Sequence, residues 1–299
     1  MRYENMILER RGRISIVTIN RPEKMNAFDE ELFLKLESIT SEIKTSLPRA
    51  VVITGAGDKS FSAGFDVHPN NPMVKRLIDA ASGNDSGPAK EIISAIRRSV
   101  DAFVSIPVPL IAAINGTAYG GGAELAVRCD MRVMEPDAVI CFSETRLGLM
   151  PDWGGGTTLT RLIGHSRAAD LILTGRKVSA DEAYTMGLAN RISAKRNVLN
   201  EAVAIAERIA LNGPRAVRSS LSLIRQNSNI TSSESLKLEA LLAVELISSG
   251  ECFHGVGAFL EKEILSFLMY KTINIQIKRW ARRLNFSLAI ADKISFFVA

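Results

Sequence analysis

Three acidic residues lie beside glycine-rich turns in the middle of the chain. Glu124 follows the glycines 120–122 in "NGTAYGGGAELAVRCD", Glu144 lies in "CFSETRLGLMPDWGGG", and Asp152 stands just before a second glycine triplet. A carboxyl group placed to deliver or remove a proton contributes about 10² to 10⁴ in rate. These residues therefore indicate acid–base chemistry, although hydrophobic periodicity alone does not establish that they converge.

The glycines 120–122 come at an expected strand-to-helix turn. Glycine adopts positive φ and allows close approach to the main chain, at a cost in chain entropy. The first N–H groups of a helix lack intrahelical partners, and the helix dipole adds partial positive charge there. The N–H of Gly121 is therefore a candidate donor to an oxyanion. A second glycine turn, "DKSFSAGFDV", offers the N–H of Phe65 to the same oxygen; loss of one such donor typically costs about 10² to 10³ in rate.

Both features also have structural explanations. The triplet is equally compatible with a tight turn that packs a helix closely on a strand, and Glu124 with a carboxylate that stabilises the helix dipole. Other chemistry is not indicated: there is no GxxxxGK[ST] motif, and "GAGDKS" lacks the third glycine of a dinucleotide fingerprint. The three histidines stand far apart in no ligand spacing, so no metal is expected.

An α/β body is expected to position these residues. Five segments rich in Ile and Val and bounded by Gly, Pro or Asn predict strands: 14–20, 50–55, 109–115, 131–134 and 138–142. Apolar residues at helical spacing predict helices at 29–44, 166–175 and 200–213. Ser179 and Glu182 have capping-box spacing, with Gly187 as the expected C-cap. The last third is expected to be mostly helical.

The segment 68–90 is rich in Pro, Asn, Ser and Gly at both ends. This composition predicts a mobile loop with one short helix. Such loops often shape a pocket.

Composition favours an intracellular protein with a neutral body. The chain has 299 residues, of which 46% are hydrophobic, and a formal charge of +5. Residues 271–299 hold six basic residues and one acid, which leaves 31 basic and 31 acidic residues in 1–270. We therefore expect no nucleic-acid partner. Three cysteines without CxxC spacing argue against a disulfide framework, and no signal peptide or spanning segment is visible, so a cytoplasmic location is expected.

The C-terminal segment reads as a basic amphipathic helix. Apolar residues recur every three or four positions from Ile273 to Leu288. Another face carries the basic residues Lys278, Arg279, Arg282 and Arg283. Docking on its own protein or a neighbouring subunit, contact with an anionic membrane surface or acidic partner, and a disordered extension are the alternatives.

Several longer stretches resemble the crotonase, or enoyl-CoA hydratase/isomerase, superfamily. The resemblance covers residues 5 to about 268 and rests on "INRPEKMNAF", "FSAGFDV", "AAINGTAYGGGAELAVRCD", "FSETRLGLMPDWGGGTTLTRLIG", "LTGRKVSADEAYTMGLANRI" and "GVGAFLEKE". It implies a spiral of ββα units followed by a helical trimerisation region, often as a dimer of trimers. The expected division is a catalytic core at 1–196, a helical oligomerisation region at 197–270 and the tail at 271–299.

The resemblance also implies a role for each candidate residue. The N–H groups of Phe65 and Gly121 would bind the thioester carbonyl of an acyl-CoA. Glu144 would deliver or remove the α-proton, and Glu124 would activate the water that adds at the β-carbon. Coenzyme A is part of the substrate, so no separate cofactor is expected. The residues that would contact it are Lys24, Met25, Ala63, Asp66, Phe259 and Lys262.

Two residues depart from the hydratase pattern. Asp152 occupies a position where typical hydratases have glycine and where the dienoyl-CoA isomerase branch has a catalytic aspartate. Phe65 is bulkier than the common alanine and would narrow the acyl pocket. The leading expectation is syn hydration of a 2-enoyl-CoA. The alternatives are a double-bond isomerase that uses Glu144 with Asp152, and an inactive relative that binds acyl-CoA or RNA.

Overall fold

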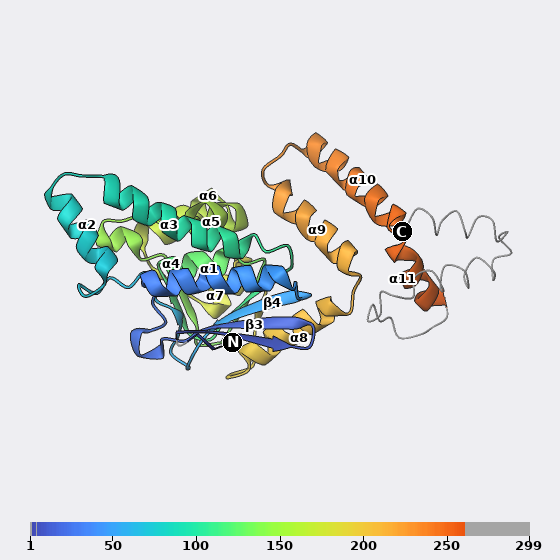
Figure 1. Cartoon of the computed structure of the whole chain (residues 1–299), viewed down its shortest axis with the longest axis horizontal. Helices are drawn as coiled ribbons and strands as arrows, with labels where there is room; N and C mark the ends of the chain where they lie inside the picture. The colour runs from blue at the N-terminus through green and yellow to red at the C-terminus, as the bar shows by residue number, and fades with distance from the viewer. Residues whose placement is uncertain (1, 4, 261–299) are drawn as a thin grey trace. The chain divides into compact units, whose positions relative to one another are not determined.

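The computed structural model describes residues 2–3 and 5–260 (Figure 1). The chain divides into two compact units, Met1–Ala206 and Glu207–Ala299, with the boundary inside helix α8 (Val198–Ala210). The sequence places its boundary earlier, at residue 196. Lys262 and the segment 271–299 lie outside the described residues.

The first unit contains a seven-stranded sheet in the order β1-β2-β3-β4-β6-β8-β11. Its first two pairings are antiparallel, and every pairing from β3 onward is parallel. The strands are Arg2–Tyr3, Met6–Arg11, Ile14–Ile19, Ala50–Gly55, Leu110–Ile114, Met131–Met134 and Arg191–Ile192. β4 and β6 are buried along their whole length, which explains their unbroken apolar sequences, because parallel strands are covered on both faces.

A second sheet of four short strands has the order β10-β9-β7-β5. These strands are β5 (Ser60–Ser62), β7 (Thr117–Tyr119), β9 (Val139–Cys141) and β10 (Lys177–Ser179). The strands β4, β6 and β8 of the first sheet are each followed by a strand of the second sheet and then by one or two α-helices. This repeat is the ββα spiral that the sequence resemblance predicts, so the expected fold class is confirmed.

Helices follow or flank each pair of strands. They are η1 (Pro22–Lys24), α1 (Glu30–Thr45), α2 (Pro72–Ser82), α3 (Gly87–Val104), α4 (Gly121–Arg128), η2 (Glu144–Leu147), α5 (Gly155–Ile163), α6 (His165–Thr174) and α7 (Ala180–Thr185). α1 begins where the Asp29 side chain accepts a hydrogen bond from Leu32 N, a normal N-cap. α1 and α3 pack against each other (Figure 1).

The segment 68–90 contains the short helix that the sequence predicts, but it has less loop than expected. Residues 72–82 form helix α2, and α3 begins at Gly87. The pair Asn71-Pro72 is a helix start: the Asn71 side chain accepts a hydrogen bond from Met73 N, and proline occupies the first turn, where its missing N–H costs nothing.

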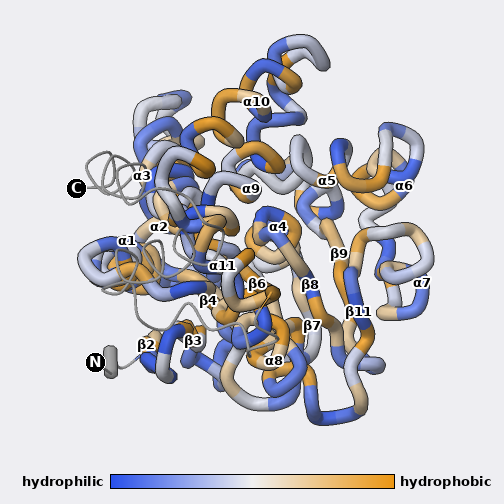
Figure 2. Tube along the Cα trace, turned by 90° about the vertical axis from the view of Figure 1, so that its right-hand side faces the viewer, coloured by the Kyte–Doolittle hydropathy of each residue, from blue (hydrophilic) through white to orange (hydrophobic). Residues whose placement is uncertain are grey.

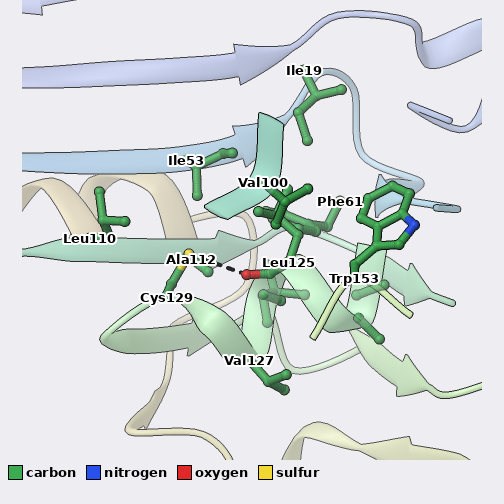
Figure 3. Packing of buried hydrophobic residues seen from close by; sticks show 14 of the residues in the cluster. Ile19, Ile53, Phe61, Val100, Leu110, Ala112, Leu125, Val127, Cys129 and Trp153 are labelled. Atoms are coloured by element: carbon green, nitrogen blue, oxygen red, sulfur yellow. Dashed lines mark hydrogen bonds between the residues drawn. The ribbon is translucent and has the colours of Figure 1, made fainter. Parts of the chain in front are cut away.

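The core of the first unit lies between the sheets and these helices, and β6 and β9 are mainly hydrophobic in Figure 2. Its largest fully buried side chains include Trp153, Phe28, Phe61, Phe103 and Phe142. Trp153 and Phe61 lie at one end of the cluster drawn in Figure 3. The Trp153 ring meets Phe28 and Phe33 edge-on, with centroids 5.5 and 5.1 Å away. The core therefore anchors the residue next to Asp152.

The described part of the second unit is helical, as expected for the last third. After α8 come α9 (Pro214–Asn227), α10 (Ser232–Ser248) and α11 (Glu251–Leu260). A capping box of Thr231 and Glu234 begins α10. The buried carboxylate of Glu251 accepts hydrogen bonds from the N–H groups of Arg215 and Ala216 at the start of α9. Among the described residues, every helix is too short or too polar to cross a membrane.

Candidate active site

The glycines 120–122 make the turn between β7 and α4. Gly120 adopts a φ of 50°, and α4 begins at Gly121, as the sequence predicts. A side chain at Gly121 would collide with the Trp153 indole ring. Tight packing therefore accounts for part of the glycine requirement, in agreement with the structural explanation of the triplet.

The same turn lies against the second glycine turn. A Cβ atom added to Gly64 would stand 2.6 Å from the nitrogen of Gly121. Phe28 N donates to Gly64 O at 2.7 Å and Asp66 N donates to Phe28 O at 2.9 Å, so the intervening Phe65 N–H is passed over. Among the described residues, neither Phe65 N nor Gly121 N has an acceptor. The fold thus brings the two expected oxyanion donors into neighbouring turns.

Glu124 lies in the first turn of α4 and is fully buried. Its Oε1 accepts a hydrogen bond from Asp152 N at 3.1 Å, and its Oε2 accepts one from Gly155 N at 2.7 Å. A side chain at Gly155 would collide with Glu124, so only glycine lets this main chain reach the carboxylate. Two donors to one carboxylate favour its charged form and fix its orientation.

Glu144 begins η2 and is 8% exposed. Its carboxyl group faces the Gly120 turn, since Oε1 would stand 3.7 Å from a Cβ atom at Gly120. Both carboxyl oxygens are buried, and neither has a hydrogen-bond partner of normal geometry within the described residues. An unpartnered buried carboxyl group favours its neutral form.

The electrostatics of the three carboxyl groups are coupled. Burial raises the pKa of Glu124 to about 8, with a further rise from the Glu144 charge and an opposing effect of the Gly155 N–H. Burial also raises the pKa of Glu144, to which the Asp152 charge adds. The pKa of Asp152 is raised by burial and held back by the Arg97 charge. The two glutamates therefore retain one proton between them until about pH 8, and the two main-chain N–H groups that Glu124 accepts favour the form in which Glu124 is ionised and Glu144 carries that proton.

The expected coenzyme A residues of the first unit come from two adjoining loops. Met25 ends η1 with a φ of 53°, and its carbonyl accepts a hydrogen bond from Ala63 N at 2.9 Å. Asp66 is tied into the first loop because its Oδ2 accepts from an Arg21 guanidinium nitrogen 3.3 Å away. Lys24 is exposed beside them. The loops that carry these residues are thus fixed to each other.

The two remaining expected coenzyme A residues lie outside the first unit. Phe259 lies on α11 in the second unit and is 76% exposed. Lys262 lies outside the described residues.

Sequence reasoning missed two side chains that hold the site. Asn26 is buried with a φ of 56°, and its amide donates to the carbonyls of Ala56 and Ser60. Arg128 donates to the carbonyl of Trp153 at 2.6 Å. The signal for Arg128 was present, because it stands four residues after Glu124 and must share a helix face with it.

Comparison with known proteins identifies the family. The enoyl-CoA hydratase/isomerase family profile matches residues 9–268. A short-chain-enoyl-CoA hydratase of Clostridium acetobutylicum is 34% identical over 88% of this chain and 97% of its own. A crotonyl-CoA hydratase of Syntrophomonas wolfei is 34% identical over 90% of this chain and 99% of its own.

A solved structure is similar as well. The enoyl-CoA hydratase from Bacillus anthracis matches with a TM-score of 0.79 and 33% identity, over 88% of this chain and 99% of its own. The motif-based resemblance is therefore confirmed. The chain belongs to the enoyl-CoA hydratase/isomerase family of the crotonase superfamily.

Proposed function

We propose that this protein hydrates a short-chain 2-enoyl-CoA, with Glu124 and Glu144 as its catalytic acid–base pair. The observation that carries the proposal is the contrast between the two buried carboxyl groups. Glu124 accepts two main-chain N–H groups, whereas Glu144 accepts none of normal geometry. A base and an acid can therefore coexist at neutral pH. The similarity to relatives named as short-chain and crotonyl-CoA hydratases supports the acyl length.

The geometry suggests a direct sequence of events. The thioester carbonyl oxygen accepts hydrogen bonds from Phe65 N and Gly121 N. The ionised Glu124 takes a proton from a water molecule as the water oxygen bonds to the β-carbon. The electron pair of the double bond moves toward the carbonyl, and the two N–H groups stabilise the developing enolate. Neutral Glu144 then gives its proton to the α-carbon, which leaves Glu144 ionised and Glu124 protonated.

A substrate panel tests this function. Crotonyl-CoA should lose the absorbance of its conjugated thioester and gain the mass of one water. Glu124→Gln and Glu144→Gln should each lower this rate by about 10² to 10⁴, since each removes one proton transfer. Failure of the purified protein to add water to any 2-enoyl-CoA would refute the proposal.

A specific observation also keeps double-bond isomerisation as a second candidate. The half-buried Asp152 carboxyl group lies close enough to Glu144 to raise its pKa, so it can serve as a second proton carrier. Asp152→Gly separates the two functions, because it removes the carboxyl group and keeps the N–H that Glu124 accepts. A hydratase should retain its rate in this variant, whereas an isomerase should lose it.

We further propose that the protein assembles as a homotrimer or a dimer of trimers. Helix α10 buries none of its residues within the single chain. Its exposed apolar side chains are Leu236, Leu241, Val244 and Ile247, with 55 to 67% of their surface accessible. Burying such a face drives association. Light scattering should give a multiple of three chains, and Leu241→Asp should lower it.

A further inference from the structure

Residues 152–155 are held by two side chains of one helix. Glu124 and Arg128 stand one turn apart on α4, so they occupy the same helix face. Glu124 accepts from the first and last N–H of this segment, and Arg128 Nη1 donates to the Trp153 carbonyl between them at 2.6 Å. The segment is thus bound to α4 at three consecutive points, and the arginine supplies the central one.

A second helix, α3, fixes the arginine itself. Asp101 on α3 places Oδ1 2.6 Å from Arg128 Nη1, and its Oδ2 lies 3.3 Å from Arg97 Nη2. The Arg128 side chain is only 14% exposed, so its charge is mostly desolvated and depends on this partner. The guanidinium group also lies against Gly154, and this contact further restricts the segment 152–155.

We propose that Arg128 and Asp101 are positioning residues that set the orientation of Glu124. The inference rests on the proposed function, since it assigns Glu124 a proton transfer. Arg128 holds the Trp153 carbonyl and so aims the flanking N–H groups of Asp152 and Gly155 at the carboxylate. Without the guanidinium group, the carbonyl loses its donor, the segment shifts, and the carboxylate follows its two donors.

The kinetic test separates positioning from binding. Arg128→Met should lower kcat by about 10- to 100-fold, because a displacement near 1 Å of a catalytic group has that order of effect. KM should stay within about twofold, because no bond to the substrate is removed. Arg128→Lys should recover part of kcat, since an ammonium reaches one partner but cannot fork to both. Asp101→Asn, at a half-exposed site, should give a smaller fall in a protein that still folds.

Arg98→Met is the matched control. Arg98 lies on the same helix as Asp101 and pairs with Glu37 at 3.0 Å, away from residues 152–155. This variant removes the same charge and an ion pair, although at a more exposed arginine. Its kcat and KM should equal those of the wild type.

A second readout does not depend on activity. Hydrogen exchange followed by mass spectrometry should show faster exchange of the peptide covering 150–156 in Arg128→Met and Asp101→Asn, and no change in Arg98→Met. If the wild type hydrates no enoyl-CoA, the proposed function fails while the exchange result still tests the positioning. Wild-type kcat together with unchanged exchange in Arg128→Met and Asp101→Asn would overturn the inference. A change in KM alone would overturn it as well.

Discussion

Burial of the two glutamates makes the stability of this protein depend on pH. The pKa of Glu124 stands at about 8 in the folded protein, against an ordinary value of 4.5, and the pKa of Glu144 is raised as well. The unfolded chain releases these protons near pH 4.5, whereas the folded chain retains at least one until about pH 8. The resulting stabilisation is fully present below about pH 4.5, the pKa of these groups in the unfolded chain. It is lost at about 1.4 kcal/mol per pH unit, for each retained proton, as the pH rises toward 8.

Glu144→Gln should reduce this loss. The substitution removes the carboxyl group that retains the proton of the pair and leaves Glu124 its two N–H donors, so the variant has no retained proton to lose between pH 6 and 8. The variant should therefore gain up to about 2 to 3 kcal/mol of unfolding free energy relative to the wild type between pH 6 and 8. It should do so while losing catalytic activity.

Urea unfolding monitored by tryptophan fluorescence at a fixed protein concentration, in steps from pH 5.5 to 8.5, measures this difference. Glu207→Gln, which removes an exposed carboxyl group, is the control and should run parallel to the wild type. If the unfolding free energies of Glu144→Gln and the wild type change with pH in parallel over pH 6 to 8, the coupling of the two glutamates is refuted. A difference that widens as the pH falls would refute it as well.

Three further substitutions test the packing around the site by thermal or urea unfolding. Glu124→Gln should destabilise the protein by about 1 to 3 kcal/mol, because an amide offers one acceptor to two N–H donors and turns its NH₂ toward the other; equal or greater stability at pH 7 would contradict this. Trp153→Ala should cost about 3 to 5 kcal/mol, the usual cost of emptying a buried aromatic site, and a loss below 1 kcal/mol would show that the ring is not packed as described. Asn26→Ala should lower the unfolding free energy by about 2 to 4 kcal/mol, because it leaves the carbonyls of Ala56 and Ser60 without their side-chain donor. The exposed control Asn229→Ala should lower it far less.

The sequence predicted α1, α8 and the strands β3, β4 and β6 because their signals are local, whereas α3, α9 and α10 received no predicted range. β4 matches its predicted range, and α1 and β6 differ from theirs by a residue. The strands β5, β7 and β10 escaped prediction because three residues carry too little alternation to be seen. Helix α2 was expected without bounds, because Asn71-Pro72 has the composition of a turn as well as of a helix start.

The glycine turns located the site by composition, but they did not give its electrostatics. Whether a buried glutamate serves as base or acid depends on the hydrogen bonds it accepts, and those donors come from a segment far along the chain. Glu124 receives them from Asp152 N and Gly155 N, and both are main-chain groups that any residue except proline supplies. Residue type at position 152 therefore carries no information on this contact. Gly155 alone carries a sequence signal, because a side chain there would collide with Glu124.

The main chain and the side chain of Asp152 bear separately on the choice between hydratase and isomerase. Position 152 contributes an N–H that orients Glu124 and a carboxyl group that raises the pKa of Glu144. A glycine there keeps the first contribution and lacks the second, which is compatible with hydration by the two glutamates alone. An aspartate adds a third negative charge, and Arg97 offsets part of it. The presence of Asp152 is therefore no argument against hydration, because the proposed acid–base pair of Glu124 and Glu144 does not require its carboxyl group.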